Sequence, residues 1–242
     1  MTDPNQLHEP ICGLLLIDKP MGFTSMDVCA VIRGRLKAGG APKRVKVGHA
    51  GTLDPLATGL LVILVGRATR LCERFMADTK AYTTTIDLSV TNATYDLESE
   101  TEPVPVAAPP SRSDIERALT AFVGDIEQTP PAHSAMKVGG RRAYTLARSG
   151  QDPKLEPRPV RIDSLDITAY TWPSLELAIT CGKGTYIRSL ARDIGAALGT
   201  GGVLTALRRT RTGSFLVDDA EQLEDLPDPL DPFSLTMPDL DE

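Results

Sequence analysis

Short apolar runs bounded by glycine and proline predict strands near the start of the chain. Residues 60–65, Leu-Leu-Val-Ile-Leu-Val, form a continuous apolar run, which is typical of a strand buried on both faces. Residues 13–17 give a second run that ends at an Asp-Lys-Pro turn. Neither run approaches the roughly 20 apolar residues that span a bilayer, so we expect no membrane crossing.

Apolar residues at helical spacing predict five helices. The first has Thr24 or Ser25 as its N-cap, and the third opens with the capping-box sequence Ser113-Asp114-Ile115-Glu116. The last stops at Gly199. The predicted ranges are 25–36, 68–76, 113–124, 142–148 and 185–198.

Alternating and proline-rich stretches complete the pattern. Residues 82–90 alternate like a strand, and residues 158–181 are typical of two strands separated near Trp172-Pro173. Residues 99–112 and 128–137 are too rich in proline to be regular. Because strands and helices are mixed without strict βαβ alternation, the expected fold class is α+β with a mixed sheet.

The composition is that of a globular protein with one substantial core, since 41% of the 242 residues are hydrophobic and 24% are charged. No secretory signal is recognisable, so we expect a cytoplasmic protein. The four cysteines are scattered and only three histidines are present, so we expect buried reduced thiols and no metal site. The cysteines are Cys12, Cys29, Cys72 and Cys181.

The net charge of −6 conceals an uneven distribution. Ten of the 32 acidic residues lie in residues 218–242, so the rest of the chain has 22 acidic residues against 26 basic ones. A basic body suits a polyanionic partner, although basic clusters are also typical of solvated faces. The clusters are Lys37, Lys43, Arg44 and Lys46; Lys137, Arg141 and Arg142; and Arg208, Arg209 and Arg211.

Residues 48–61 present one carboxylate, Asp54, in a loop rich in glycine. Gly48, Gly51 and Gly59 permit backbone angles that other residues resist, and Pro55 restricts the residue before it. The pattern predicts a rigid loop that offers a nucleophile, although Asp54 could also merely cap a turn. A glycosidase is disfavoured because no second carboxylate is similarly framed nearby.

Three more motifs stand in order along the chain: residues 15–25 (Leu-Leu-Ile-Asp-Lys-Pro-Met-Gly-Phe-Thr-Ser), 80–82 (Lys-Ala-Tyr) and 183–188 (Lys-Gly-Thr-Tyr-Ile-Arg). With residues 128–137, 140–144 and 207–210, they make residues 13–216 similar to the bacterial tRNA pseudouridine-55 synthases. The resemblance implies the pseudouridine synthase fold, with a mixed, largely antiparallel central sheet flanked by helices and loops. It also implies conversion of a T-loop uridine of tRNA to pseudouridine, without a cofactor.

The resemblance implies a catalytic group of three residues. Asp54 would add to C6 of the base, attack C1′ of the sugar or remove a sugar proton, and the sequence does not choose among these routes. Arg188 would keep the carboxylate charged and is expected to project along the rim of its helix. Tyr82 would stack on the target base.

The remaining site residues are expected to bind RNA. His49 would pack into the opened tRNA loop, and Leu207 would close the other side of the base. Lys19 would support the active-site loop or meet a phosphate. Tyr186 belongs to the same motif as Arg188, and phosphate contacts are expected from Lys137, Arg141, Arg208 and Arg209.

Departures from the family pattern shape the expected domains. Residues 1–12 form an extension, 13–217 the catalytic domain, with an RNA-gripping insertion at about 101–157, and 218–242 an acidic tail in place of a PUA-like domain. The tail is expected to be disordered or to compete with RNA. Residues 36–47 are an insertion that adds positive charge. We expect a monomer; the alternatives are a tRNA-binding folding chaperone or a synthase acting on another RNA.

Overall fold

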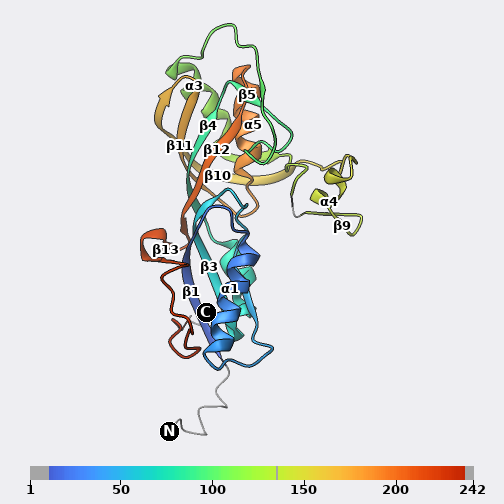
Figure 1. Ribbon diagram of the computed structural model, residues 1–242. Helices are drawn as coiled ribbons and strands as arrows, with labels where there is room; N and C mark the ends of the chain where they lie inside the picture. Colours follow the sequence, from blue (N-terminus) through green and yellow to red (C-terminus); the bar gives the residue numbers. More distant parts are fainter. Residues whose placement is uncertain (1–10, 135, 238–242) are drawn as a thin grey trace. The chain divides into compact units, whose positions relative to one another are not determined.

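The computed structural model describes residues 11–134 and 136–237 (Figure 1). The chain forms two compact units: unit 1 contains the residues up to Asp78 and those from Arg208 onward, and unit 2 contains Thr79–Leu207. Strand β12 (Val203–Thr212) contributes its first half to unit 2 and its second half to unit 1.

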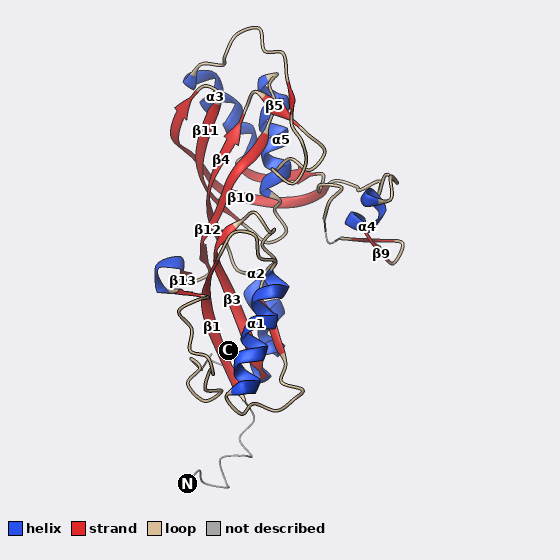
Figure 2. Ribbon diagram, in the orientation of Figure 1, coloured by secondary structure: helices blue, strands red, loops and turns tan. Residues whose placement is uncertain are grey.

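Unit 1 is a layer of strands covered by helix α1 (Figure 2). Its hydrogen-bonded strand order is β14-β1-β3-β12, with β2 added to β3 and β13 to β12. The elements are β1 (Cys12–Lys19), α1 (Ser25–Ala38), β2 (Val47–His49), β3 (Thr58–Gly66), the 3-10 helix η2 (Arg67–Leu71), α2 (Cys72–Ala77), β13 (Phe215–Leu216), the 3-10 helix η4 (Val217–Asp219) and β14 (Glu221–Gln222).

Strand β3 is buried on both faces, as its apolar run predicted. Leu61, Ile63 and Val65 pack into the cluster that contains α1, whereas alternate residues pack into a second cluster with Phe75. Helix α1 begins after the N-cap Thr24, whose Oγ1 accepts a hydrogen bond from the Asp27 amide at 3.1 Å. The predicted strand and N-cap are therefore confirmed.

Residues 218–237 pack within unit 1, so the expectation of a disordered tail is wrong for this part. β14 pairs in parallel with β1, and the Arg35 guanidinium donates to the Leu223 and Leu226 carbonyls at 2.9 and 2.6 Å. Apolar residues scattered among the carboxylates fill the same cluster as α1. They are Leu223, Leu226, Leu230 and Leu235.

Unit 2 has the strand order β12-β4-β11-β10-β7, and the pairs β4–β11, β11–β10 and β10–β7 are antiparallel. Helices α3 and α5 pack on this sheet through one apolar cluster. The elements are β4 (Lys80–Asp87), β5 (Val90–Thr91), β6 (Glu102–Pro103), α3 (Arg112–Leu119), the 3-10 helix η3 (Thr120–Phe122), β7 (Gly124–Gln128), β8 (Lys137–Val138), β9 (Arg141–Arg142), α4 (Ala143–Arg148), β10 (Arg158–Thr171), β11 (Ser174–Cys181) and α5 (Ile187–Leu198).

Three predicted boundaries in unit 2 shift for local reasons. The capping box of α3 is Ser111 with Asp114, because the Asp114 carboxylate accepts from the Ser111 amide at 3.0 Å. Strand β4 ends at Asp87, whose carboxylate accepts from the Ser89 amide at 2.8 Å and turns the chain. Helix α5 begins two residues later than predicted, at Ile187.

The fold class is confirmed as α+β, with a mixed and mostly antiparallel sheet. Two parallel pairs, β1–β14 and β3–β12, lie in unit 1. Across residues 11–134 and 136–237, no helix has the length and apolar character needed to cross a membrane. The four cysteines are not disulfide-bonded, but only Cys29 and Cys181 are buried, whereas Cys12 and Cys72 are half-buried.

Candidate functional site

The loop that carries Asp54 connects β2 to β3 and is held by a residue at the start of helix α1. The neighbouring Leu53 is buried, and its amide donates to Ser25 Oγ at 2.8 Å. The Ala57 amide donates to the Asp54 carbonyl at 3.1 Å and closes a turn. Asp54 itself is partly exposed. The loop is therefore held in place around an accessible carboxylate.

Lys19 supports this loop from inside unit 1. The side chain is completely buried, and Nζ donates to the carbonyls of Phe23, Pro20 and Pro55 at 2.6, 2.9 and 3.3 Å. Burial lowers the pKa of Lys19 to about 8, and the negative charge of Asp54 opposes this shift. Of its two predicted roles, loop support matches these contacts, whereas a phosphate contact does not fit a buried ammonium group.

Arg209 is also buried, at 1% exposed, and it clamps the two ends of the loop. Nε donates to the Leu60 carbonyl at 2.7 Å, and Nη2 donates to the Gly51 carbonyl at 3.2 Å. The predicted phosphate contact does not fit this burial, since the guanidinium is directed into backbone carbonyls. Arg209 instead adds a second buried cation to the unit that holds Asp54.

Two of the three glycines predicted to shape the loop do so. Gly51 and Gly59 have φ of 111° and 97°, which disfavour other residues. A Cβ at Gly59 would also overlap the backbone of Arg209. Gly48 lies in β2 and has no positive φ, so the prediction that it adopts a backbone angle other residues resist is wrong.

His49 lies at the end of β2 and is partly buried. Burial lowers the pKa of His49, and the nearby positive charge of Arg209 lowers it further. The imidazole is therefore held in its neutral form near neutral pH. A neutral aromatic ring suits stacking on a base, which is the role predicted for it.

Arg208 forms a bidentate ion pair with Asp18. Nη1 and Nη2 lie 2.9 and 2.7 Å from the two carboxylate oxygens, and Gln222 donates to the same carboxylate at 3.1 Å. Burial raises the pKa of Asp18, but the hydrogen bonds from Arg208 and Gln222 outweigh it and lower the pKa overall. The half-exposed guanidinium thus joins β12 to β1, in addition to any phosphate contact.

In unit 2, Arg188 is buried, so the expected position on the helix rim is wrong. Its Nη1 lies 3.3 Å from Asp96 Oδ2 and donates to the Thr94 carbonyl at 3.2 Å, while Nη2 donates to the His133 carbonyl at 2.9 Å. Only 5% of the residue is exposed. A buried guanidinium needs such partners, and these three hold it in a fixed orientation.

Sequence reasoning missed Asp96, the carboxylate that faces Arg188. It lies in a loop in which Asn92 Nδ2 donates to the Asp96 carbonyl at 2.6 Å and the Glu98 amide donates to Asp96 Oδ1 at 2.9 Å. The run Asn-Ala-Thr-Tyr-Asp signals only a turn. Its pairing with an arginine 92 positions away required the structure.

Gln128 ties the proline-rich segment to the start of α5. The Tyr186 amide donates to Gln128 Oε1 at 2.8 Å, and Gln128 Nε2 donates to the Tyr186 carbonyl at 3.2 Å. Ser189 Oγ also donates to the Thr129 carbonyl at 2.8 Å. The irregular segment is therefore anchored by side chains, and the backbone of Tyr186, two residues before Arg188, is fixed by Gln128.

Other predicted residues of unit 2 lie in its sheet or in a small hairpin. Tyr82 and Leu207 are partly exposed and pack against the apolar cluster of the unit. Lys137 lies in β8, which pairs with β9, and the exposed Arg141 approaches Gln151 Oε1 at 3.5 Å.

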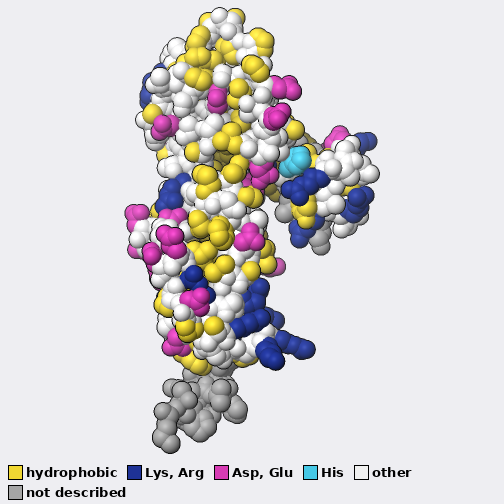
Figure 3. Space-filling view, in the orientation of Figure 1, with side chains coloured by type: hydrophobic (Ala, Val, Ile, Leu, Met, Phe, Trp, Pro, Cys, Tyr) yellow, Lys and Arg dark blue, Asp and Glu magenta, His cyan; other side chains and the backbone are white. Residues whose placement is uncertain are grey.

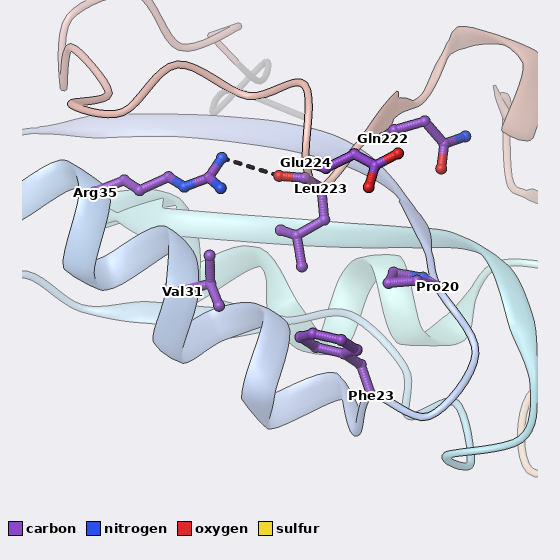
Figure 4. Close-up of a pocket in the computed structure, with 7 residues that line it drawn as sticks. All are labelled: Pro20, Phe23, Val31, Arg35, Gln222, Leu223 and Glu224. Carbon is purple, nitrogen blue, oxygen red and sulfur yellow. Dashed lines mark hydrogen bonds between the residues drawn. The ribbon is translucent and has the colours of Figure 1, made fainter.

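Figure 4 shows a groove between α1 and the C-terminal segment in unit 1. It has a volume of about 310 Å³ and is lined by Pro20, Phe23, Val31, Arg35, Gln222, Leu223 and Glu224. None of the predicted site residues lines it. In the part of the chain that the structure describes, no cluster of three or more potential metal ligands occurs.

Unit 1 thus brings together Lys19, His49, Asp54 and Arg209, and unit 2 brings Arg188 and Tyr186 together with the 128–134 segment. The sequence matches the model of the "TruB family pseudouridylate synthase (N terminal domain)" over residues 40–187. A second model, "tRNA pseudouridylate synthase B C-terminal domain", matches residues 188–231, which include much of the segment predicted to be an acidic tail.

Curated relatives are similar over most of the chain. A tRNA pseudouridine synthase B of Phocaeicola vulgatus is 44% identical over 90% of this chain and 93% of its own length. The Mycobacteroides abscessus enzyme of the same name is 46% identical over 94% of this chain and 75% of its own.

Two solved structures contain chains with a similar fold. A Cbf5-Nop10-Gar1 complex contains a chain that is 29% identical with a TM-score of 0.68, covering 93% of this chain and 56% of that one. An H/ACA RNP bound to a substrate RNA containing 2′-deoxyuridine gives 27% identity, a TM-score of 0.65, and coverage of 93% and 55%. The protein therefore belongs to the TruB family of pseudouridylate synthases.

Proposed function

We propose that this protein isomerises a uridine in the T loop of tRNA, at position 55, to pseudouridine. The observation that carries the proposal is the similarity to tRNA pseudouridine synthases B over 90% of the chain, which includes the loop of Asp54. The reaction would take place in the cytoplasm with a monomeric enzyme and without a cofactor or metal.

The reaction breaks the bond from N1 to C1′, turns the uracil and joins C5 to C1′, and the C5 proton moves to solvent while N1 gains one. Atoms and electrons therefore balance without an oxidant. One ionised carboxylate is enough to hold a fragment or to remove a proton. The buried cation Lys19 interacts electrostatically with Asp54, and such a charge favours the ionised carboxylate that the role of nucleophile requires.

The roles of the other residues follow the family resemblance. Tyr82 would stack on the base, Arg188 would act with Asp54, and Leu207 would close the far side of the base. His49 would occupy the opened tRNA loop, and Tyr186 would contact the substrate. Lys137 and Arg141, within the RNA-gripping residues 101–157, would contact phosphates, as would Arg208. Arg209 is reassigned to positioning the loop.

The decisive variant is Asp54→Asn, which keeps the size of the side chain and removes its charge. We expect loss of pseudouridine formation by at least about 1000-fold in a T-arm transcript, measured by tritium release from C5, because the nucleophile is absent. The matched control is Asp219→Asn, an exposed carboxylate in η4, which should leave the rate unchanged.

Conversion by Asp54→Asn at the normal rate would refute the enzymatic proposal. Unchanged binding of the T arm by the same variant, together with restored folding of a denatured tRNA, would instead reveal a chaperone activity that is separate from catalysis.

A second candidate is a synthase that acts on another RNA. It is favoured by the similarity to a chain from an H/ACA RNP bound to a substrate RNA. The test offers the enzyme an isolated T-arm stem-loop alone. Full conversion supports the tRNA proposal, whereas activity only on a different RNA supports the second candidate.

A further inference from the structure

Six basic residues and no acidic ones lie between Asp27 and Asp54. Two of these cations serve the fold: Arg33 donates to the Val47 carbonyl at 3.0 Å, and Arg35 donates to carbonyls of the C-terminal segment. The other four side chains are exposed. We call them the basic loop surface: Lys37, Lys43, Arg44 and Lys46.

The side chains of the basic loop surface make no polar contacts within the described part of unit 1. Within residues 11–134 and 136–237, none of its four side chains makes a hydrogen bond or an ion pair. Some other exposed cations are neutralised locally, such as Arg112 by Glu116 at 2.9 Å and Arg117 by Asp114 at 2.6 Å. The positive charge of the surface is therefore available to an outside partner. Figure 3 shows Lys and Arg side chains gathered beside the loop that follows α1.

The backbone under the surface is fixed by buried neighbours. Ala41, Val45 and Val47 alternate with the cations and pack into the cluster of α1. The Ala41 amide donates to the Leu36 carbonyl at 2.9 Å, and the Gly66 amide donates to the Lys46 carbonyl at 2.8 Å. Because this loop is already ordered, its backbone loses little conformational entropy when the charged side chains bind a partner.

Helix electrostatics account for only part of this arrangement. Lys37 lies in the last turn of α1, where a cation interacts favourably with the helix dipole. Lys43, Arg44 and Lys46 lie beyond the helix, so the dipole gives no reason for them. Their spacing along an ordered, acid-free loop suits a partner with repeated negative charge.

We propose that the basic loop surface binds the phosphodiester backbone of the RNA substrate. This inference rests on the proposed function for the identity of the RNA. Lys46 precedes Asp54 by eight residues, so their Cα atoms are at most about 28 Å apart. That distance lies within one arm of a tRNA, and a phosphate contact at this position would orient the arm without reading its sequence.

The test compares two double variants that remove the same charge. Lys43→Gln with Arg44→Gln removes two cations of the surface, whereas Arg67→Gln with Arg161→Gln removes two exposed cations, on η2 and β10, that lie outside the surface and outside residues 101–157. Binding is measured on a T-arm stem-loop and on an unrelated hairpin of equal length, over a range of salt concentrations, in an Asp54→Asn background that prevents turnover.

The surface variant should bind both RNAs about tenfold or more weakly near 0.1 M salt, and the slope of log K against log salt should fall by about 2. The control variant should change neither quantity. Equal affinities and slopes for the surface variant and its parent would overturn the proposal. A loss confined to one RNA would also overturn it, because it would mean recognition of sequence and not of phosphate.

Catalysis separates this proposal from the proposed function. In the otherwise native enzyme, the surface variant should keep kcat at saturating T-arm RNA and raise KM. If the native enzyme forms no pseudouridine, the proposed function fails, and the binding result still decides the basic loop surface. If both RNAs bind the surface variant and its parent equally well, but an acidic protein binds the two with different affinities, the surface would be reassigned to a protein partner.

Discussion

At the residue scale, the chemistry of the Asp54 loop depends on buried side chains that a sequence pattern does not reveal. The pattern predicted the rigid loop, two of its three glycines and Asp54 itself. It did not predict that Arg209 is buried, because the carbonyls of Gly51 and Leu60 that receive its hydrogen bonds lie about 150 positions earlier in the chain. Basic residues in a cluster are usually solvated, so Arg209 was wrongly grouped with its exposed neighbours.

Lys19 gives a pH-dependent prediction. Its pKa is lowered from 10.5 to about 8, so between these values the unfolded chain binds a proton that the folded protein has lost. The free energy of unfolding should therefore rise with pH across this window relative to a Lys19→Met variant, which lacks the group. Urea unfolding at pH 7, 8, 9 and 10 measures the difference. A constant difference would contradict the lowered pKa.

Gly59→Ala should destabilise the protein by about 2 kcal/mol or more, because φ is positive and the new Cβ would overlap the Arg209 backbone. The matched control is Gly34→Ala on the exposed face of α1, where a Cβ meets open space. That change should stabilise by about 0.5–1 kcal/mol. Thermal unfolding of both variants decides whether the Gly59 site is constrained as described.

At the element scale, local signals identified the five helices and the strands β1, β3, β4, β10 and β11, but missed β12, β7 and the short strands. The apolar run of β3 predicted its burial on both faces, and Thr24 predicted the start of α1. Both predictions succeeded because each depends on a few neighbouring residues. The C-terminal segment lacked such a signal. Its leucines are separated by prolines and carboxylates without helical or alternating spacing, so only their packing against α1 revealed that they belong to the core.

Leu226→Ala tests whether this segment contributes to the core of unit 1. The side chain is buried, so its truncation should cost about 2–4 kcal/mol of unfolding free energy. Phe233→Ala is the control in the same segment, because 57% of Phe233 is exposed and little should change. Equal effects of the two substitutions on the denaturant midpoint would show that the segment is peripheral.

At the scale of the whole molecule, sequence motifs identified the family and the fold class. The net charge alone was a poor indicator of the partner. A chain of net charge −6 would ordinarily repel RNA, yet the acidic residues concentrate near the C-terminus and the basic loop surface is left unpaired. The reaction was predictable from the resemblance of the ordered motifs to a known family, because the motif residues are visible in the sequence. The partners of Arg188 were not, because they depend on which distant loops the fold brings to α5.

The split of unit 1 in the sequence governs the order in which the protein can be completed during synthesis. Unit 2 is one continuous stretch, Thr79–Leu207, whereas unit 1 needs strands and leucines that come after it. At about 5–20 residues per second, a ribosome takes roughly 6–26 s to translate that stretch. Throughout this interval β1, α1 and β3 have been synthesised, but the residues that finish their core have not. Unit 1, whose first strands are synthesised before unit 2, is therefore the last unit to complete its core.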